Sequence, residues 1–372
     1  MSNARNLANL LGTGTQITTA DIADGAFQAN KNIIINGAVT VNQRGNQTTT
    51  NGGSVYFVDR FNVFHNSAAA VANLQQSTDT PSGQGFGNSM LIDVTTADTS
   101  IAAGEVAVLR QILEGQNLQQ LKYGTSSAES LTLSFWVKSS KTGVHICELY
   151  HNDSQAKTQS QSYTISSANT WEKHSVTFSG DTAATLDNDN QYTIAVQWGL
   201  FAGTDFSSGT LQTTWANLTN ANRFAGQVNL FDSTSNNFYL TGVQLEVGET
   251  ATPFEHRSYG EELARCQRYY FRTSNASAGY QNLATCAYIG STIFRGVIEF
   301  PVTMRAIPTF SHTGAFQTLG GFNISSLAAG DGATIDSHGI QVATNETGSA
   351  GQSLLFRANN DSNARLMYDA EL

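Results

Sequence analysis

N-F-Y-L-T-G-V-Q-L-E-V-G-E-T-A-T-P-F-E-H-R, residues 237–257, decides the fold of this chain. Its first half alternates apolar and polar residues, which predicts a β-strand with one buried face. The alternation slips once, at Thr241-Gly242, as it does where an extra residue forms a bulge. Gly248 and Pro253 then end the strand, because neither residue favours its continuation. The stretch therefore predicts the last strand of one domain and a hinge into the next.

Short alternating segments precede this strand throughout residues 32–250. The clearest is S-L-T-L-S-F-W-V-K, residues 130–138, in which Trp136 lies on an otherwise polar face. N-I-I-I-N-G-A-V-T-V-N-Q-R-G, residues 32–45, opens with an apolar run and continues in alternation, so it is also predicted to be β. Roughly ten such strands separated by turn residues are typical of an antiparallel sandwich or jelly roll.

One helix is predicted after the hinge, at residues 258–271, where Ser258 and Glu261 form a capping box. Strands follow it, and the Gly- and Ser-rich residues 324–351 predict a long loop with one short strand. The chain is therefore predicted to be all-β: an antiparallel jelly-roll sandwich, a linking helix and a smaller C-terminal β domain. The predicted parts are an N-terminal arm (1–31), the jelly roll (32–250), the hinge and helix (251–272) and the C-terminal domain (273–372).

Residues 1–31 differ from the rest because their first apolar residues follow a helical spacing. Helical pieces this short are marginal alone and need a partner surface. We therefore expect an attachment or assembly arm rather than a simple flexible tail. The residues expected to make the contact are Leu7, Leu10, Leu11, Ile17 and Ile22.

The composition limits the possible functions. Charged residues make up 13% and Gly numbers 33, which fits a β-rich chain with many turns, and the 10% of aromatic residues argues against disorder. A net charge of −10 without a Lys/Arg cluster excludes a nucleic-acid partner. Three cysteines without a C-x-x-C pair predict a reducing cytoplasm as the place of synthesis. We expect no signal peptide and no membrane span.

Motifs for catalysis or cofactors are missing from the sequence, so no cofactor is predicted. Asp187 and Asp189 alternate with Asn residues and form a weak candidate Ca²⁺ site, for which a plain Asx-rich turn is the favoured interpretation. Glycoside hydrolysis needs two carboxylates about 5–10 Å apart, and nothing in the sequence pairs two of them. We therefore predict no enzyme.

Carbohydrate binding without chemistry fits the residues better. Sugars stack on exposed aromatic rings, while neighbouring amides and hydroxyls fix their orientation. Trp215 follows L-Q-T-T in a predicted loop, so we expect it to be the most exposed ring. Each ring has core or rim packing as its alternative role. The candidate glycan-binding residues are Trp136, Trp171, Trp215 and Tyr150.

Six motifs in a fixed order carry a resemblance to a known family. They are N-I-I-I-N-G-A-V-T-V-N-Q-R-G (32–45), V-D-R-F (58–61), T-L-S-F-W-V-K-S (132–139), N-T-W-E-K (169–173), F-Y-L-T-G-V-Q-L-E-V-G (238–248) and A-T-P-F-E-H-R-S-Y-G-E-E-L-A-R-C-Q-R-Y (251–269). Together they resemble structural proteins of tailed bacteriophages, especially the tail-fibre-like and appendage proteins of marine and cyanobacterial phages. The module, over residues 32–270, is itself similar to carbohydrate-binding jelly rolls.

The resemblance implies a noncatalytic virion protein, made in the host cytoplasm. It implies a homotrimer that docks on other virion proteins by its N-terminal arm and contacts host-surface polysaccharide. A purely architectural capsid, vertex or collar decoration protein is the first alternative, and a polysaccharide depolymerase is the second. The position on the particle stays open.

The charged run Glu255, His256 and Arg257 has two interpretations. A catalytic role is one, and a linker that fixes the relative pose of the two domains is the favoured one. In that case, replacing Arg257 with Ala loosens the packing of the domains and leaves each of them folded.

Overall fold

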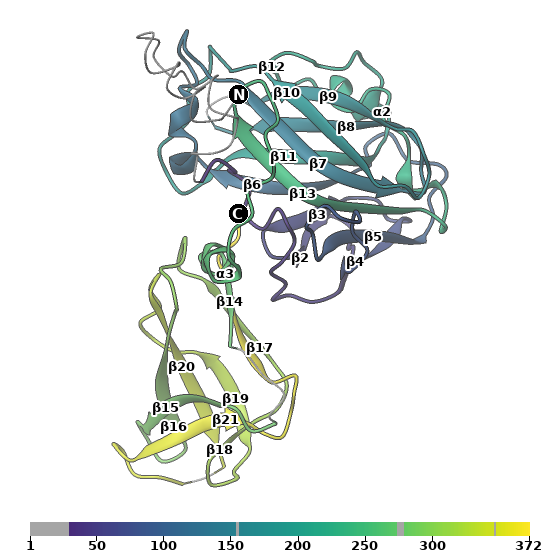
Figure 1. Ribbon diagram of the computed structural model, residues 1–372. Helices are drawn as coiled ribbons and strands as arrows, with labels where there is room; N and C mark the ends of the chain where they lie inside the picture. Colours follow the sequence, from purple (N-terminus) through teal and green to yellow (C-terminus); the bar gives the residue numbers. More distant parts are fainter. Residues whose placement is uncertain (1–29, 154–155, 274–278, 346) are drawn as a thin grey trace, which may run out of the picture.

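The computed structural model describes residues 30–153, 156–273, 279–345 and 347–372. Figure 1 shows two β-rich parts, one before and one after helix α3 (Tyr259–Gln267), with strand β14 (Tyr270–Arg272) leading from the helix into the second part. The predicted attachment residues Leu7, Leu10, Leu11, Ile17 and Ile22 lie outside the described residues.

The first part is a sandwich of two antiparallel sheets. One sheet has six strands, which in spatial order are β1 (Gln47–Thr48), β4 (Val71–Ser77), β5 (Ser89–Thr96), β13 (Asn237–Val247), β7 (Leu131–Ser139) and β10 (Glu172–Phe178). The other has seven, which are β12 (Ala216–Asn217), β9 (Lys157–Ile165), β8 (Gly143–His151), β11 (Tyr192–Ala202), β6 (Val106–Glu114), β3 (Phe61–His65) and β2 (Gly53–Val58). The connections between strands also include helix α2 (Thr204–Ser207) and short 3-10 turns at Gly115–Asn117, Gln119–Leu121, Asn220–Asn222 and Leu230–Asp232.

Inward-facing apolar residues of the two sheets form one core, as the alternation predicts. Phe135 of β7 meets Trp198 of β11 edge to face at 5.8 Å and Tyr163 of β9 at 5.1 Å. Rings from opposite sheets therefore interlock, and burying them is the main force that holds the sheets together. The predicted all-β jelly-roll sandwich is confirmed.

Strand β13 has the predicted bulge. Its pairing with β7 shifts register between Thr241 and Gln244, and Gly242 has a φ of 61°, a left-handed value that glycine adopts without strain. The pairing with β5 stops at Leu240. Beyond the bulge, the edge of β13 that faced β5 therefore needs new hydrogen-bond partners.

Residues 32–37 supply those partners, and the prediction of a strand at 32–45 is wrong. Asn32 accepts a hydrogen bond from Leu245 N–H at 3.1 Å and donates one to the Val243 carbonyl at 3.1 Å. Gly37 accepts from Val243 N–H at 3.0 Å. Side chains and turns, rather than a ladder, satisfy the backbone here, and Asn36 and Val39 have positive φ values that a strand excludes. The apolar residues of this segment still point into the core.

The second part contains two further antiparallel sheets. The smaller has β14, β22 (Arg365–Asp369) and β17 (Thr309–Thr313), in that order. The larger has β18 (Phe316–Thr318), β21 (Ser353–Ala358), β15 (Asn282–Tyr288), β16 (Ile293–Glu299), β20 (Ser337–Thr344) and β19 (Ile324–Ala329). The two sheets enclose a core of their own. The predicted long loop at 324–351 is wrong, because β19 and β20 pair with each other there and β20 also pairs with β16.

Helix α3 confirms the predicted helix, although it is shorter. The Ser258 side chain accepts a hydrogen bond from Glu261 N–H at 3.3 Å, as expected of an N-cap. The helix ends at Gln267, and Tyr270, which was predicted to continue it, already belongs to β14. The backbone of residues 270–272 pairs with β22, so the chain is extended there and the helix cannot continue.

Ion pairs connect the two parts around α3. Arg44 and Arg60 of the first part both pair with Glu371 of the second, and Arg44 does so at 3.2 Å. Arg268, which follows the helix, pairs with Glu114 of β6 at 2.8 Å. The three arginines belong to the motifs at 32–45, 58–61 and 251–269 that carry the family resemblance. These motifs therefore hold the two parts together, a role that their sequence alone did not reveal.

Candidate functional site

A groove lies on the outer face of the seven-stranded sheet, and we call it the β11 groove. Its volume is about 210 Å³. Its lining comes from strands β3, β6, β8 and β11, from Asn152 and from the loop residue Arg223. The lining residues are Phe64, Val106, Val108, Arg110, Tyr150, Asn152, Tyr192, Gln197 and Arg223. Phe206 and Phe224 cover Val106, Val108 and Ile146 at one end of the same face. The polar and aromatic residues occupy the part that remains open.

Strand register explains why these side chains meet. Gln197 of β11 lies opposite Glu148 of β8 on one side and opposite Arg110 of β6 on the other. Arg110 in turn lies opposite Asn62 of β3. Since directly paired residues point to the same face of a sheet, four polar side chains form a row across four strands. Tyr150 lies two residues beyond Glu148, on the same face.

Glu148, at one end of the row, forms an ion pair with the loop residue Arg223. Arg223 donates three hydrogen bonds to the Glu148 carboxylate, at 2.6 to 3.1 Å, and its guanidinium lies 5.1 Å from the centre of the Tyr150 ring. Burial raises the pKa of the Glu148 carboxyl, and the charge of Arg223 opposes that shift. Arg223 of this pair lines the groove and lies against the ring of Tyr150, which lies 6.3 Å from that of Tyr192.

Gln197 is the unusual member of the row. Its residue is only 2% exposed, and its side-chain amide makes no hydrogen bond to any of the described residues. The amide faces the open groove, so its donor and its acceptor are accessible to a ligand. Because Gln197 lines the groove, a ligand there could satisfy both its donor and its acceptor.

Of the four predicted glycan-binding residues, Tyr150 alone lies in this groove. Trp171 is on the opposite, six-stranded sheet, where its ring is 6.1 Å from Tyr239 and its Nε1 donates to Asp79 at 3.0 Å. Lys138 pairs with the same carboxylate and lies 4.2 Å from the Tyr239 ring. The polar groups of this cluster are therefore already bound to one another.

The other two tryptophans are half-buried. Trp215, which was expected to be the most exposed ring, donates from Nε1 to the Ser179 carbonyl at 2.6 Å and packs 5.9 Å from Tyr123. Trp136 is on the outer face of β7, and a Cβ on Gly242 would lie 3.1 Å from its ring. Both rings serve packing, which is the alternative role that the sequence left open.

The candidate Ca²⁺ residues belong to a turn. The Asp189 side chain accepts from Gln191 N–H at 3.0 Å, and the Asp187 backbone N–H donates to Asp153 at 3.0 Å. Asn190, which follows Asp189, donates to the Arg305 carbonyl at 2.7 Å, so the turn is part of the contact with the second β part. Within the ranges that the structure describes, no three His, Cys, Asp or Glu side chains gather as metal ligands would.

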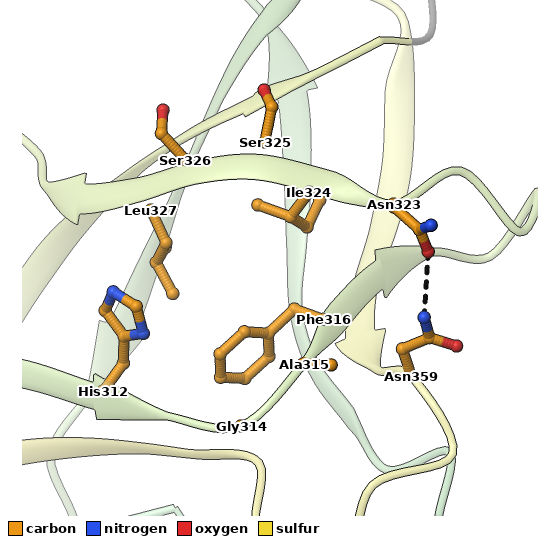
Figure 2. Close-up of a pocket in the computed structure, with 10 residues that line it drawn as sticks. All are labelled: His312, Gly314, Ala315, Phe316, Asn323, Ile324, Ser325, Ser326, Leu327 and Asn359. Carbon is orange, nitrogen blue, oxygen red and sulfur yellow. Dashed lines mark hydrogen bonds between the residues drawn. The ribbon is translucent and has the colours of Figure 1, made fainter.

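A second cavity, of about 330 Å³, opens in the C-terminal part. Figure 2 shows Ile324 and Leu327 of β19 pointing toward Phe316, with His312 at one side and the Asn323–Asn359 hydrogen bond at the other. Ser325 and Ser326 point away from the cavity. A three-stranded sheet cannot cover all of a six-stranded one, so apolar residues of β18 and β19 remain open here.

Sequence reasoning missed Arg110, Tyr192 and Gln197. Each interrupts or borders an apolar strand, in V-A-V-L-R-Q-I-L-E and Y-T-I-A-V-Q-W-G-L-F. A polar residue at an apolar strand's outward position was the available signal. This signal could be interpreted only with knowledge of which strands are neighbours, and the sequence does not reveal that.

None of the helices in the described residues combines the length and hydropathy that a membrane span requires.

Comparison with known proteins gives only distant likeness. No family model and no curated protein match the chain. A family 11 carbohydrate-binding module from Clostridium thermocellum, in complex with a mixed-linked tetrasaccharide, aligns with a TM-score of 0.28 and 13% identity over 56% of this chain and 98% of that one. The tandem CBM22 domains of Paenibacillus barcinonensis Xyn10C align with a TM-score of 0.29 and 10% identity over 93% and 98%.

The third structure is the enzymatically active domain of tailspike protein 4 from bacteriophage CBA120. It aligns with a TM-score of 0.29 and 12% identity over 58% of this chain, and the match spans 21% of the tailspike chain. These TM-scores place the protein in none of the three families.

Proposed function

We propose that this chain is a noncatalytic structural protein of a phage virion that binds host-surface glycans through the β11 groove. The observation that carries the proposal is the amide of Gln197, which has no hydrogen-bond partner among the described residues and lines the groove beside the rings of Tyr150 and Tyr192. Saccharides combine an apolar C–H face with hydroxyls, so they match a site that has both rings and amides.

The hydrogen-bonding groups of the groove also favour a saccharide over a purely apolar ligand. Gln197 offers one donor group and one acceptor, the pattern that a sugar hydroxyl complements. Asn152 and the two tyrosines place further polar groups along the same lining. The cluster around Trp171 lacks this property, because its indole N–H and ammonium groups already bind Asp79.

The charge arrangement supports a noncatalytic role. Hydrolysis of a glycosidic bond needs two carboxylates, one of them free to donate a proton and both close to the sugar. The carboxylate nearest the groove along β8, Glu148, is fully buried and held by three hydrogen bonds from Arg223. The residues that line the groove include neither Asp nor Glu.

The proposed protein is also a homotrimer that is attached to the virion. Most of the large exposed apolar side chains lie at or after Tyr259, and we propose that another copy of the chain covers part of them. A homotrimer would bury them, while residues 1–31 would attach it to the particle. Deleting that arm should leave a folded protein that no longer enters virions. Normal incorporation of the shortened protein would refute the arm.

A glycan array with the purified chain tests the binding directly. Tyr150→Ala should weaken binding to host polysaccharide by about tenfold or more, since a central aromatic contact is lost. Trp171→Ala, on the opposite sheet, is the matched control and should bind normally. Absence of binding by the unmodified chain would favour a purely architectural protein. Release of reducing ends, abolished by a single carboxylate substitution, would favour a depolymerase.

A further inference from the structure

Arg110 is a fixed cation on the lining of the β11 groove. Its Nε donates to Asn62 Oδ1 at 3.0 Å and its Nη2 donates to Ser54 Oγ at 2.8 Å. Both acceptors are neutral groups, so they orient the guanidinium and do not neutralise its positive charge. Its guanidinium also lies 5.3 Å from the centre of the Phe64 ring, one of the rings that line the groove.

The surroundings leave that charge uncompensated. Among the described residues, no Asp or Glu oxygen comes within 4 Å of the Arg110 nitrogens, and Nη1 has no hydrogen-bond partner. The neighbouring Arg223 is different, because Glu148 neutralises it. In a chain with a net charge of −10, an oriented arginine without a carboxylate is available to an anion.

Two further polar groups lie next to Arg110 in the cross-strand row. Gln197 is directly opposite it on β11 and has no partner of its own among the described residues. Asn62, opposite it on β3, has a fully buried side-chain nitrogen without a hydrogen-bond partner in the described part. An oxygen-rich anionic group in the groove would pair with Arg110 and with the donor of Gln197, whereas Asn62 is fully buried outside the lining and serves to orient Arg110.

From this we infer that the saccharide of the β11 groove is acidic, and that Arg110, assisted by the amide of Gln197, receives its carboxylate or sulfate group. The inference rests on the proposed glycan binding at this groove. In this assignment the rings of Tyr150 and Tyr192 contact the sugar, and Arg110 selects the acidic residue among otherwise similar sugars.

A structural role for Arg110 makes a different prediction. Its hydrogen bonds join β6 to β2 and β3, so a purely structural arginine would affect stability and leave the choice between acidic and neutral sugars unchanged. Selectivity, measured as a ratio of two affinities, separates the two roles.

The test uses titration calorimetry on the full chain with three probes. They are oligogalacturonate, the same oligomer with its carboxyl groups reduced to alcohols, and a sulfated galactan oligomer. The unmodified chain should bind at least one acidic probe about tenfold or more tighter than the reduced one, with an affinity that falls as salt rises. Arg110→Gln should abolish that ratio, and Arg110→Lys should keep part of it. Lys173→Gln, on the opposite sheet, removes one positive charge as the matched control.

Each result decides between the possibilities. A preference for oligogalacturonate identifies a carboxylate, and a preference for the sulfated probe identifies a sulfate. Equal affinity for acidic and reduced probes, or an unchanged ratio in Arg110→Gln, overturns the acidic assignment, while the groove itself stands if Tyr150→Ala still weakens binding. If none of the three probes binds, the acidic assignment falls, and the glycan array decides separately whether the groove binds a neutral saccharide.

Discussion

At Gly37 the backbone of the segment 32–37 lies directly against β13, whose Val243 N–H donates to the Gly37 carbonyl at 3.0 Å. A Cβ at this position would overlap the Val243 carbonyl oxygen, a backbone atom that cannot move without breaking the contact. Gly37→Ala should therefore lower the free energy of unfolding by about 1–3 kcal/mol. Gly87→Ala is the control, because nothing lies within 4 Å of a Cβ built there. Equal denaturation midpoints for the two variants would contradict this packing.

His145 makes the stability of the sandwich depend on pH. Its pKa is lowered to about 4, chiefly by burial and also by the charges of His174 and Lys141, although a hydrogen bond to the Lys141 carbonyl opposes the shift. The unfolded chain has a histidine pKa of about 6.5. The folded state thus binds the proton less readily, so the contribution of His145 is complete above about pH 6.5 and decreases as the pH falls toward 4.

We expect this loss to be roughly 2–3 kcal/mol between pH 7 and pH 4.5. Thermal unfolding at the two pH values measures it. His145→Gln should flatten the dependence without abolishing it, because burial also lowers the pKa of His65. His312→Gln replaces an exposed histidine and should leave the slope unchanged. If His145→Gln keeps the full slope, the buried imidazole is not its source.

At the scale of elements, Arg257 connects the hinge, the segment 32–37 and α3. Its side chain is 3% exposed, donates to the carbonyls of Ile34 (2.9 Å) and Asn32, and pairs with Glu255 (3.2 Å) and Glu262 (3.6 Å). Burial alone would raise the pKa of Glu255, but hydrogen bonds from backbone N–H groups and the charge of Arg257 lower it. The contacts support the linker interpretation of the charged run.

Arg257→Ala should cost about 3–5 kcal/mol, because it leaves the buried Glu262 and the half-buried Glu255 without their cation. Hydrogen exchange should increase in residues 30–37 and in α3, while circular dichroism shows both β parts folded. Lys122→Ala removes an exposed ion pair with Glu129 and should cost at most about 1 kcal/mol. Unchanged exchange around α3 in Arg257→Ala would refute the linker role.

The elements differ in how well the sequence predicted them. Strict alternation predicted β7 and the bulged β13, and a capping box predicted α3, because these signals act within one segment. Residues 32–45 and 324–351 were predicted wrongly, since their structure depends on distant partners: the edge of β13 for the first, and β16 for the second. Prediction of the groove likewise required the register of the paired strands. Tyr150 could be predicted as an aromatic candidate from its residue type. Arg110 and Gln197 could not be predicted, because their place in the groove depends on which strands pair with β6 and β11.

For the whole molecule, the question is how tightly the two β parts are coupled. Glu371 pairs with both Arg44 and Arg60, so removing its charge leaves the buried Arg60 without a carboxylate and leaves Arg44 with Asp369 alone. Glu371→Gln should weaken the joint by about 3–5 kcal/mol and split a single calorimetric unfolding transition into two. Glu299→Gln, at an exposed position, should keep one transition. A single transition in Glu371→Gln would show that this cluster does not couple the parts.

The β11 groove is the centre of the account, and a crystal structure of the chain with an acidic oligosaccharide tests it most directly. We expect a sugar ring against Tyr150 and Tyr192, a hydrogen bond to the Gln197 amide, and the acidic group within about 3 Å of Arg110. A sugar bound over Trp171 and Tyr239, or in the cavity beside β19, with the β11 groove left empty, would contradict it.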